Sequence, residues 1–144
     1  MPHFLVNRRV LITIFCCSLV SGCGESRSRG AVSGIVTLDD VAIETGSISF
    51  IPLEGTNSPT SGAVITLGKY EIPREKGPMA GTFRVEIRAQ RKTGNKIAAG
   101  SPAPPGTMID ETEEAIPARY NNESTLRVDV TTGRNSHEFK LATK

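Results

Sequence analysis

Thr82-Phe83-Arg84-Val85-Glu86-Ile87-Arg88 is the stretch of sequence that decides the fold. Phe83, Val85 and Ile87 alternate with polar or charged residues, so an extended chain places these three apolar side chains on one face. A period of two is typical of a β-strand with one buried face and one solvated face. This stretch therefore predicts a strand that covers a hydrophobic core.

Similar short runs lie on both sides of this strand. They occupy residues 32–38, 47–51, 63–67, 69–72, 126–130 and 138–141. Glycine and proline fall between the runs, Asp39-Asp40 is a turn signal, and Gly68 marks a tight hairpin. About seven short strands at this spacing predict an all-β domain, built as an antiparallel β-sandwich.

Two segments fit this pattern less well. Residues 90–115 contain Pro102, Pro104 and Pro105, and we expect them to form one long loop. Loops of this length are uncommon in small domains and tend to be functional or disordered. Residues 116–120 are expected to add one more short strand.

The N-terminal segment has the pattern of an export signal. Arg8 and Arg9 precede an apolar run over residues 10–20, which is shorter than the roughly 20 residues that a spanning helix needs. The alternative, a buried element of a cytosolic domain, does not explain the order of basic flank, apolar run and small residues. We expect residues 1–22 to be a signal peptide that is removed.

The run ends in Val20-Ser21-Gly22-Cys23, which resembles the lipobox of bacterial lipoproteins. The resemblance implies lipid on Cys23 and cleavage before it, and two or more acyl chains anchor a protein stably to a membrane. Residues 23–30 are small and polar and would form a flexible tether, followed by the β-domain over residues 31–144. The expected location is a membrane, with the domain facing the periplasm or the cell surface.

Removal of residues 1–22 changes the composition that bears on function. The chain has 17 basic and 15 acidic residues, and loss of Arg8 and Arg9 leaves 17 − 2 = 15 of each, so we expect no nucleic-acid partner. Cys16 and Cys17 leave with the signal and Cys23 is modified, so no thiol remains for a disulfide, a metal or a nucleophile.

The remaining candidates for chemistry are few, and we expect no cofactor and no metal. His137 would be the only histidine, and its place beside a strand indicates a rim residue rather than a catalytic base. The acidic residues 110–114 lack the spacing of a dedicated calcium loop and indicate a solvated surface. Tyr70 and Tyr120 are the aromatic residues left for glycan stacking, and both suit half-buried packing.

The order of several motifs resembles a known family. These motifs are Val32-Ser33-Gly34-Ile35-Val36, Gly46-Ser47-Ile48-Ser49-Phe50, Gly68-Lys69-Tyr70-Glu71-Ile72 and Ala80-Gly81-Thr82-Phe83-Arg84-Val85. Together they are similar to the carboxypeptidase regulatory-like domain, a transthyretin-like β-sandwich, over residues 31–88. Residues 116–121 and 124–126 extend the likeness to small lipoproteins of planctomycete-like bacteria. Leu67-Gly68 and Met79-Ala80-Gly81 depart from the family's usual turn residues.

The resemblance implies a non-catalytic accessory or binding module. Transthyretin-like hydroxyisourate hydrolases share a histidine and arginine site and end in Tyr-Arg-Gly-Ser, for which residues 139–144 offer no counterpart. We therefore predict a structural or protein-interaction module that is not an enzyme. Residues 90–115 and the group Arg119, Tyr120 and Asn121 are the candidate contacts, although Pro117 and Asn121-Asn122 also suit a purely structural edge and turn. The alternatives are an envelope polysaccharide- or peptide-binding protein and, with less support, a hydrolase.

Overall fold

The computed structural model describes residues 28–144, so the predicted signal peptide and Cys23 lie outside the described residues. The described chain is all-β, and its helices are short 3-10 turns, none of which is long and apolar enough to cross a membrane. The strands are β1 (Gly30–Leu38), β2 (Val41–Ala42), β3 (Thr45–Pro52), β4 (Ser61–Thr66), β5 (Lys69–Ile72), β6 (Gly81–Ala98), β7 (Met108–Glu114), β8 (Arg127–Val130), β9 (Gly133–Ser136) and β10 (Phe139–Leu141). The 3-10 helices are η2 (Arg74–Lys76) and η3 (Ala118–Tyr120).

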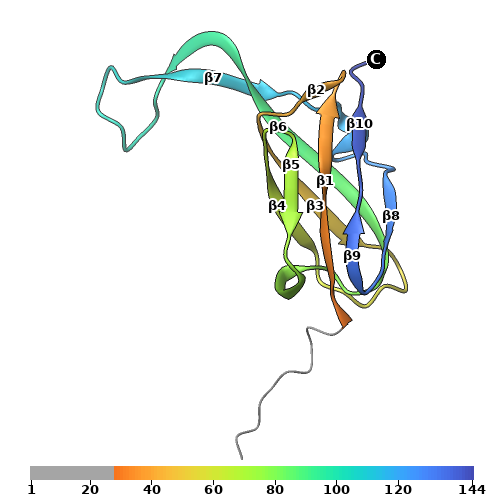
Figure 1. Cartoon of the computed structure of the whole chain (residues 1–144). Coiled ribbons are helices and arrows are strands. Elements are labelled where there is room, and N and C mark those ends of the chain that lie inside the picture. The colour runs from red at the N-terminus through yellow and green to blue at the C-terminus, as the bar shows by residue number, and fades with distance from the viewer. Residues whose placement is uncertain (1–27) are drawn as a thin grey trace, which may run out of the picture.

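The strands form one sheet that curls into a half-barrel (Figure 1). The order is β10-β1-β5-β4-β3-β6-β7, with β2 and β9 also on β1 and β8 also on β6. Most pairs are antiparallel, whereas β1 pairs in parallel with β9 and β10. The chain passes from β8, which pairs with β6, to β9, which pairs with β1, through Thr131 and Thr132 alone. This short connection brings the two ends of the sheet near each other.

The core fills the concave side of the curled sheet. Phe83, Val85 and Ile87 are each 0% exposed, which confirms the strand and the buried face predicted from their alternation. Tyr70 stands between two phenylalanines, with ring centroids 6.1 Å from Phe50 and 6.3 Å from Phe139. Burial of each such large side chain stabilises the fold by about 1.5–3 kcal/mol.

Two predicted turns are confirmed. Asp39 and Asp40 have φ of 49° and 64°, and Leu67 and Gly68 have φ of 48° and 76°. Two consecutive residues with positive φ are typical of the tight hairpin turn whose twist matches the flanking strands. The first turn joins β1 to β2 and the second joins β4 to β5.

The prediction of one long loop over residues 90–115 is wrong. Strand β6 continues without interruption to Ala98 and pairs with β7, so these residues form an ordered two-stranded ribbon. The three prolines gather in the turn, where their missing N–H groups cost the ladder nothing. We call residues 90–114 the arm and the rest of the described chain the body. The arm projects away from the body (Figure 1).

Three further details differ from expectation. Residues 116–120 form no strand, because the chain turns after Pro117 into η3 and the buried amide of Asn121 donates to Ile116 O at 3.0 Å. Gly30, assigned above to the tether, is the first residue of β1. Strands β2 and β9 have too few alternating apolar residues to be found from sequence.

Candidate functional site at the base of the arm

Cross-strand pairs of polar side chains hold the arm together. Arg91 Nη2 lies 2.7 Å from Glu113 Oε1, and the ammonium groups of Lys92 and Lys96 lie 2.5 and 2.8 Å from Asp110. Hydrogen bonds from these two lysines, together with their charges, lower the pKa of Asp110 to about 2. The arm thus gains order from pairs on its surface, which are individually weak in water.

A single carboxylate fixes the arm to the body. Oε1 of Glu114 accepts hydrogen bonds from Ala89 N at 3.0 Å and Ile116 N at 3.1 Å. Next to it, Ala115 N donates to Ala89 O at 2.8 Å. These bonds satisfy the backbone at the point where β6 leaves the body, so Glu114 and Ala115 together hold the base of the arm.

Strand β6 has an open edge beyond this point. Its neighbour β3 pairs with it only as far as Gly46 opposite Ala89, because the chain before Thr45 turns aside and Glu44 O accepts from Leu67 N at 2.9 Å. No other described strand pairs along that edge of the arm. The backbone groups of Ala89 point toward β7, so those of Gln90 point toward the end of β3, and Lys92 is the first residue whose backbone groups point toward the open edge.

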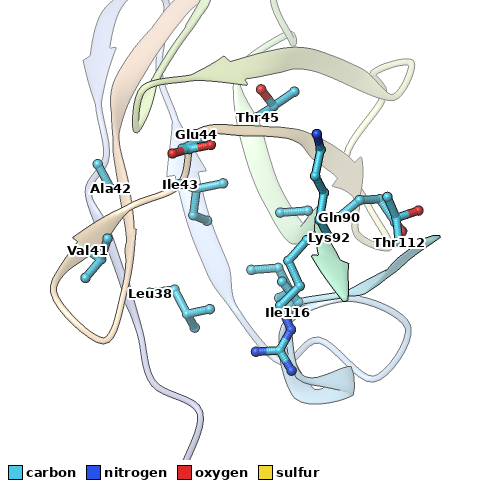
Figure 2. A pocket seen from close by; sticks show the side chains of 13 residues that line it. Leu38, Val41, Ala42, Ile43, Glu44, Thr45, Gln90, Lys92, Thr112 and Ile116 are labelled. Atoms are coloured by element: carbon cyan, nitrogen blue, oxygen red, sulfur yellow. The ribbon is translucent and has the colours of Figure 1, made fainter. Parts of the chain in front are cut away.

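A groove opens beside this edge, with a volume of about 610 Å³. Figure 2 shows Leu38 and Ile43 on one side of it, facing Gln90 and Lys92 on the other. Its apolar lining comes from four separate parts of the chain and consists of Leu38, Val41, Ala42, Ile43, Ala89, Ala115 and Ile116. Val41 at the rim is 69% exposed, so the apolar surface continues to the outside. An apolar groove with an open strand edge can bind an extended chain with apolar side chains.

The predicted contact residues Arg119, Tyr120 and Asn121 lie around η3, and the first two contact this chain's own C-terminal residues. Arg119 Nη2 donates to Ala142 O, and to Lys144 O at 3.1 Å, while its guanidinium carbon lies 5.0 Å from the centre of the Tyr120 ring. Tyr120 Oη accepts from Ala142 N at 3.3 Å. Asn121 is 3% exposed, so it faces the interior. The structure therefore brings Arg119 and Tyr120 together on the C-terminal residues Ala142 and Lys144, and places Asn121 apart from them in the interior.

His137 lies between β9 and β10 and meets no hydroxyl or carboxylate through a hydrogen bond of its ring. Its Nε2 is buried without a hydrogen-bond partner in the described structure. Burial lowers the pKa of His137, and the charge of Asp129 partly offsets this shift. The hydroxyl of Tyr70 donates to the backbone oxygen of His137 at 2.9 Å, so it ties strands together rather than serving the imidazole.

The other sequence candidates are also held by structural contacts. Tyr70 is 3% exposed and burial raises its pKa, so its ring offers no platform for a sugar. The acidic residues 110–114 alternate between the two faces of β7 and bind cations or amides of β6. Among residues 28–144, no group of three or more metal-ligating side chains converges.

Sequence reasoning missed the groove. Its lining depends on residues brought from β2, from β6 and from the segment after β7, and only the fold places these side by side. A local signal did exist, since Val41-Ala42-Ile43 follows the Asp39-Asp40 turn and places an apolar residue, Val41, where a solvated one would be expected. No family model matches the chain, and no match was found among curated proteins or among solved structures.

Proposed function

We propose that this chain is a lipid-anchored protein of the bacterial cell envelope whose β-domain is a non-catalytic interaction module. The groove at the base of the arm is the observation that favours interaction over a purely structural role. It combines apolar side chains, an exposed rim at Val41 and a strand edge that is open beyond Gln90, which are features of sites that bind another chain.

The anchor is proposed from the sequence Val20-Ser21-Gly22-Cys23. Strand β1 begins at Gly30, so only a short polar segment separates the proposed lipid from the folded domain. Cys23 and Gly30 are seven positions apart (30 − 23 = 7), and a chain of that length spans at most about 25 Å. The body would therefore lie close to the membrane surface, where partners in the envelope are within reach of the arm.

We further propose a transthyretin-like sandwich of the carboxypeptidase regulatory-like type as the finer description of the fold. In support, three of the four motifs of the resemblance coincide with a strand or with the turn or start of one. Val32-Ser33-Gly34-Ile35-Val36 lies within β1, Gly68 lies in the turn before β5, and Gly81 is the first residue of β6. An experimentally determined structure, superposed on members of that family, would test this assignment.

The function is tested in cells that express the full chain at its native level. Chemical crosslinking is followed by mass spectrometry of Cys23 and of the proteins captured, and the wild type is compared with Cys23→Ser. The proposal predicts diacylglycerol on Cys23 and at least one envelope partner that is captured only when the anchor is intact. An unmodified Cys23 would refute the anchor, and capture of no partner would refute the interaction role.

A further inference from the structure

The end of the arm has apolar side chains that the molecule leaves exposed. Ile97 and Ile109 are 44% and 46% exposed, and they stand directly opposite each other in the ladder, so their side chains share one face of the ribbon. We call these two residues the tip cluster. A small apolar cluster at the end of a projecting ribbon is the kind of surface that another protein covers.

The tip cluster cannot reach the groove of its own chain. Strand β6 has a register shift between Lys92 and Lys96, so the length of the arm follows from its partner β7, which pairs from Glu114 at the base to Met108 at the tip. These six steps (114 − 108 = 6) at about 3.3 Å each place base and tip roughly 20 Å apart. Glu114 and Ala115 hold the arm in its projecting direction at the base. One chain therefore has an apolar groove and an apolar cluster that could fill such a groove, separated by the length of the arm.

We propose that a second copy of this chain occupies the groove, with the two arms side by side and antiparallel. In this arrangement the tip cluster of each copy packs against Val41 and Ile43 at the base of the other. Because both arms have the same length, one two-fold axis places both tips in both grooves at once. The interface is therefore closed and produces a dimer rather than a filament.

The backbone supports the same geometry. The open edge of β6 faces the groove, and alternation from Ala89 directs the backbone groups of Lys92 to this edge near the base. Near the tip, Ala99 N donates to Thr107 O at 2.8 Å, so alternation directs the backbone of Ala98 to the open edge as well. Pairing of two such edges would turn two two-stranded ribbons, each marginal alone, into one four-stranded sheet.

The charges of the arm allow this approach. Arg91, Lys92 and Lys96 each have a carboxylate within 2.8 Å on their own arm. The arm has three cations and four carboxylates over residues 90–114, so it has one negative charge in excess (4 − 3 = 1) and two copies would repel weakly. Added salt screens this repulsion, and the dimer is therefore expected to strengthen with ionic strength.

This inference rests on the proposed function for the use of the groove, and its test is separate from the capture of an envelope partner. A photo-reactive phenylalanine derivative replaces Ile97 in the full chain, which is expressed in cells as two differently tagged copies. Illumination should yield a covalent product that contains both tags, with the crosslink on residues 41–45 or 89–92 of the other copy. The same product should form in Cys23→Ser cells, at lower yield, even where partner capture is lost.

Three variants test the contact in the photo-reactive background of a second arm position, Met108. Ile109→Glu places a charge in the tip cluster and Val41→Glu places one in the groove, and both positions are exposed, so folding should persist. Ile109→Glu and Val41→Glu should each reduce the yield of the doubly tagged product about tenfold, as loss of a central interface contact does. Val64→Glu is the control, because Val64 is 66% exposed on the outer face of β4, and it should change the yield less than twofold.

The alternatives each give a distinct result. Crosslinks from Ile97 to a different protein, or to this chain outside the groove, would overturn the proposal. So would the absence of any doubly tagged product, or an equal loss of product in all three glutamate variants. A dimer without a captured envelope partner would instead refute the proposed function while the self-association stands.

Discussion

The two halves of β6 belong to one strand with one side-chain period, yet they differ in pairing and in burial. From Gly81 to Ala89 the strand pairs with β8 over Gly81–Arg84 and with β3 over Phe83–Ala89, and its inward side chains are buried in the core. From Gln90 to Ala98 it is paired on one edge, and both faces meet solvent. The comparison teaches that alternation and pairing suffice for a strand, whereas stability depends on what the alternating side chains bury. The body should therefore determine the free energy of unfolding, and the arm should respond locally.

The largest contrast is expected from truncating one apolar side chain in each half. Phe83→Ala removes a fully buried ring and should lower the free energy of unfolding by about 3–5 kcal/mol. Ile97→Ala lies on the exposed arm and should change it by less than about 0.5 kcal/mol. Urea unfolding followed by circular dichroism, at a concentration low enough to keep the chain monomeric, measures both. Equal losses would show that the arm is part of the cooperative core.

The joint between the halves gives the next effect. Glu114→Ala leaves Ala89 N and Ile116 N without their acceptor and should cost about 1–2 kcal/mol, because unmade hydrogen bonds of partly buried groups are expensive. Glu113→Ala removes only a surface ion pair with Arg91 and serves as the matched control, with a loss below about 1 kcal/mol. Hydrogen exchange should show faster exchange at the arm base in the first variant alone. The same exchange in both variants would mean that Glu114 does not fix the arm.

In the body, pH should act through His137. Burial lowers the pKa of His137 in the folded chain below its ordinary value of 6.5, so the unfolded chain binds a proton that the folded chain does not. The stability linked to this group is complete above pH 6.5 and is lost as the pH falls below that value. Urea midpoints at about pH 7.5 and about pH 5.5 should differ in the wild type and differ less in His137→Gln. An unchanged difference in the variant would assign the dependence to other groups.

In the arm, pH should act through Asp110, at lower pH values than for His137 and with a smaller effect. Hydrogen bonds from Lys92 and Lys96 hold the pKa of this carboxyl at about 2, below its ordinary value of 3.8. The ordering of the arm that these bonds provide is present above pH 3.8 and is lost as the pH falls toward 2. Carboxyl shifts followed by nuclear magnetic resonance would give the pKa directly. Asp110→Asn should speed amide exchange in the arm with no change in the body, and faster exchange throughout would contradict the separation.

The same comparison explains how far sequence reasoning reached. Strands whose alternation includes apolar residues, such as β6 up to Arg88, are encoded locally and were predicted. The arm was missed because its strands alternate charged residues whose order depends on partners across the ribbon, such as Arg91 with Glu113. Strand β9, with the sequence Gly-Arg-Asn-Ser, forms because β1 is available beside it. Such elements are selected by contacts distant in sequence, which no local pattern contains.

The candidate site also has one part that the sequence indicated and one part that it did not. The residue types at Arg119 and Tyr120 indicated a contact, and the contact in the structure is with the chain's own residues Ala142 and Lys144. The groove could not be foreseen because Val41 and Ile116 are 75 positions apart (116 − 41 = 75) and meet only in the curled sheet. The sequence alone could show only that some apolar residues, such as Val41, lie outside the predicted strands.

The parallel pairing of β1 with β9 and β10 has a consequence for the order of folding. The amide of Asn135 donates to Ala31 O, 104 residues earlier in the chain, and Phe139 aligns with Val36. Contacts between such distant segments require closure of a long loop before they return any stabilisation, which makes folding slow. Strand β1 therefore lacks its parallel partners until β9 and β10 have been synthesised, and a nascent chain without β10 has no complete core. The domain is therefore expected to fold in one late step, after β10 has left the ribosome or the translocation channel.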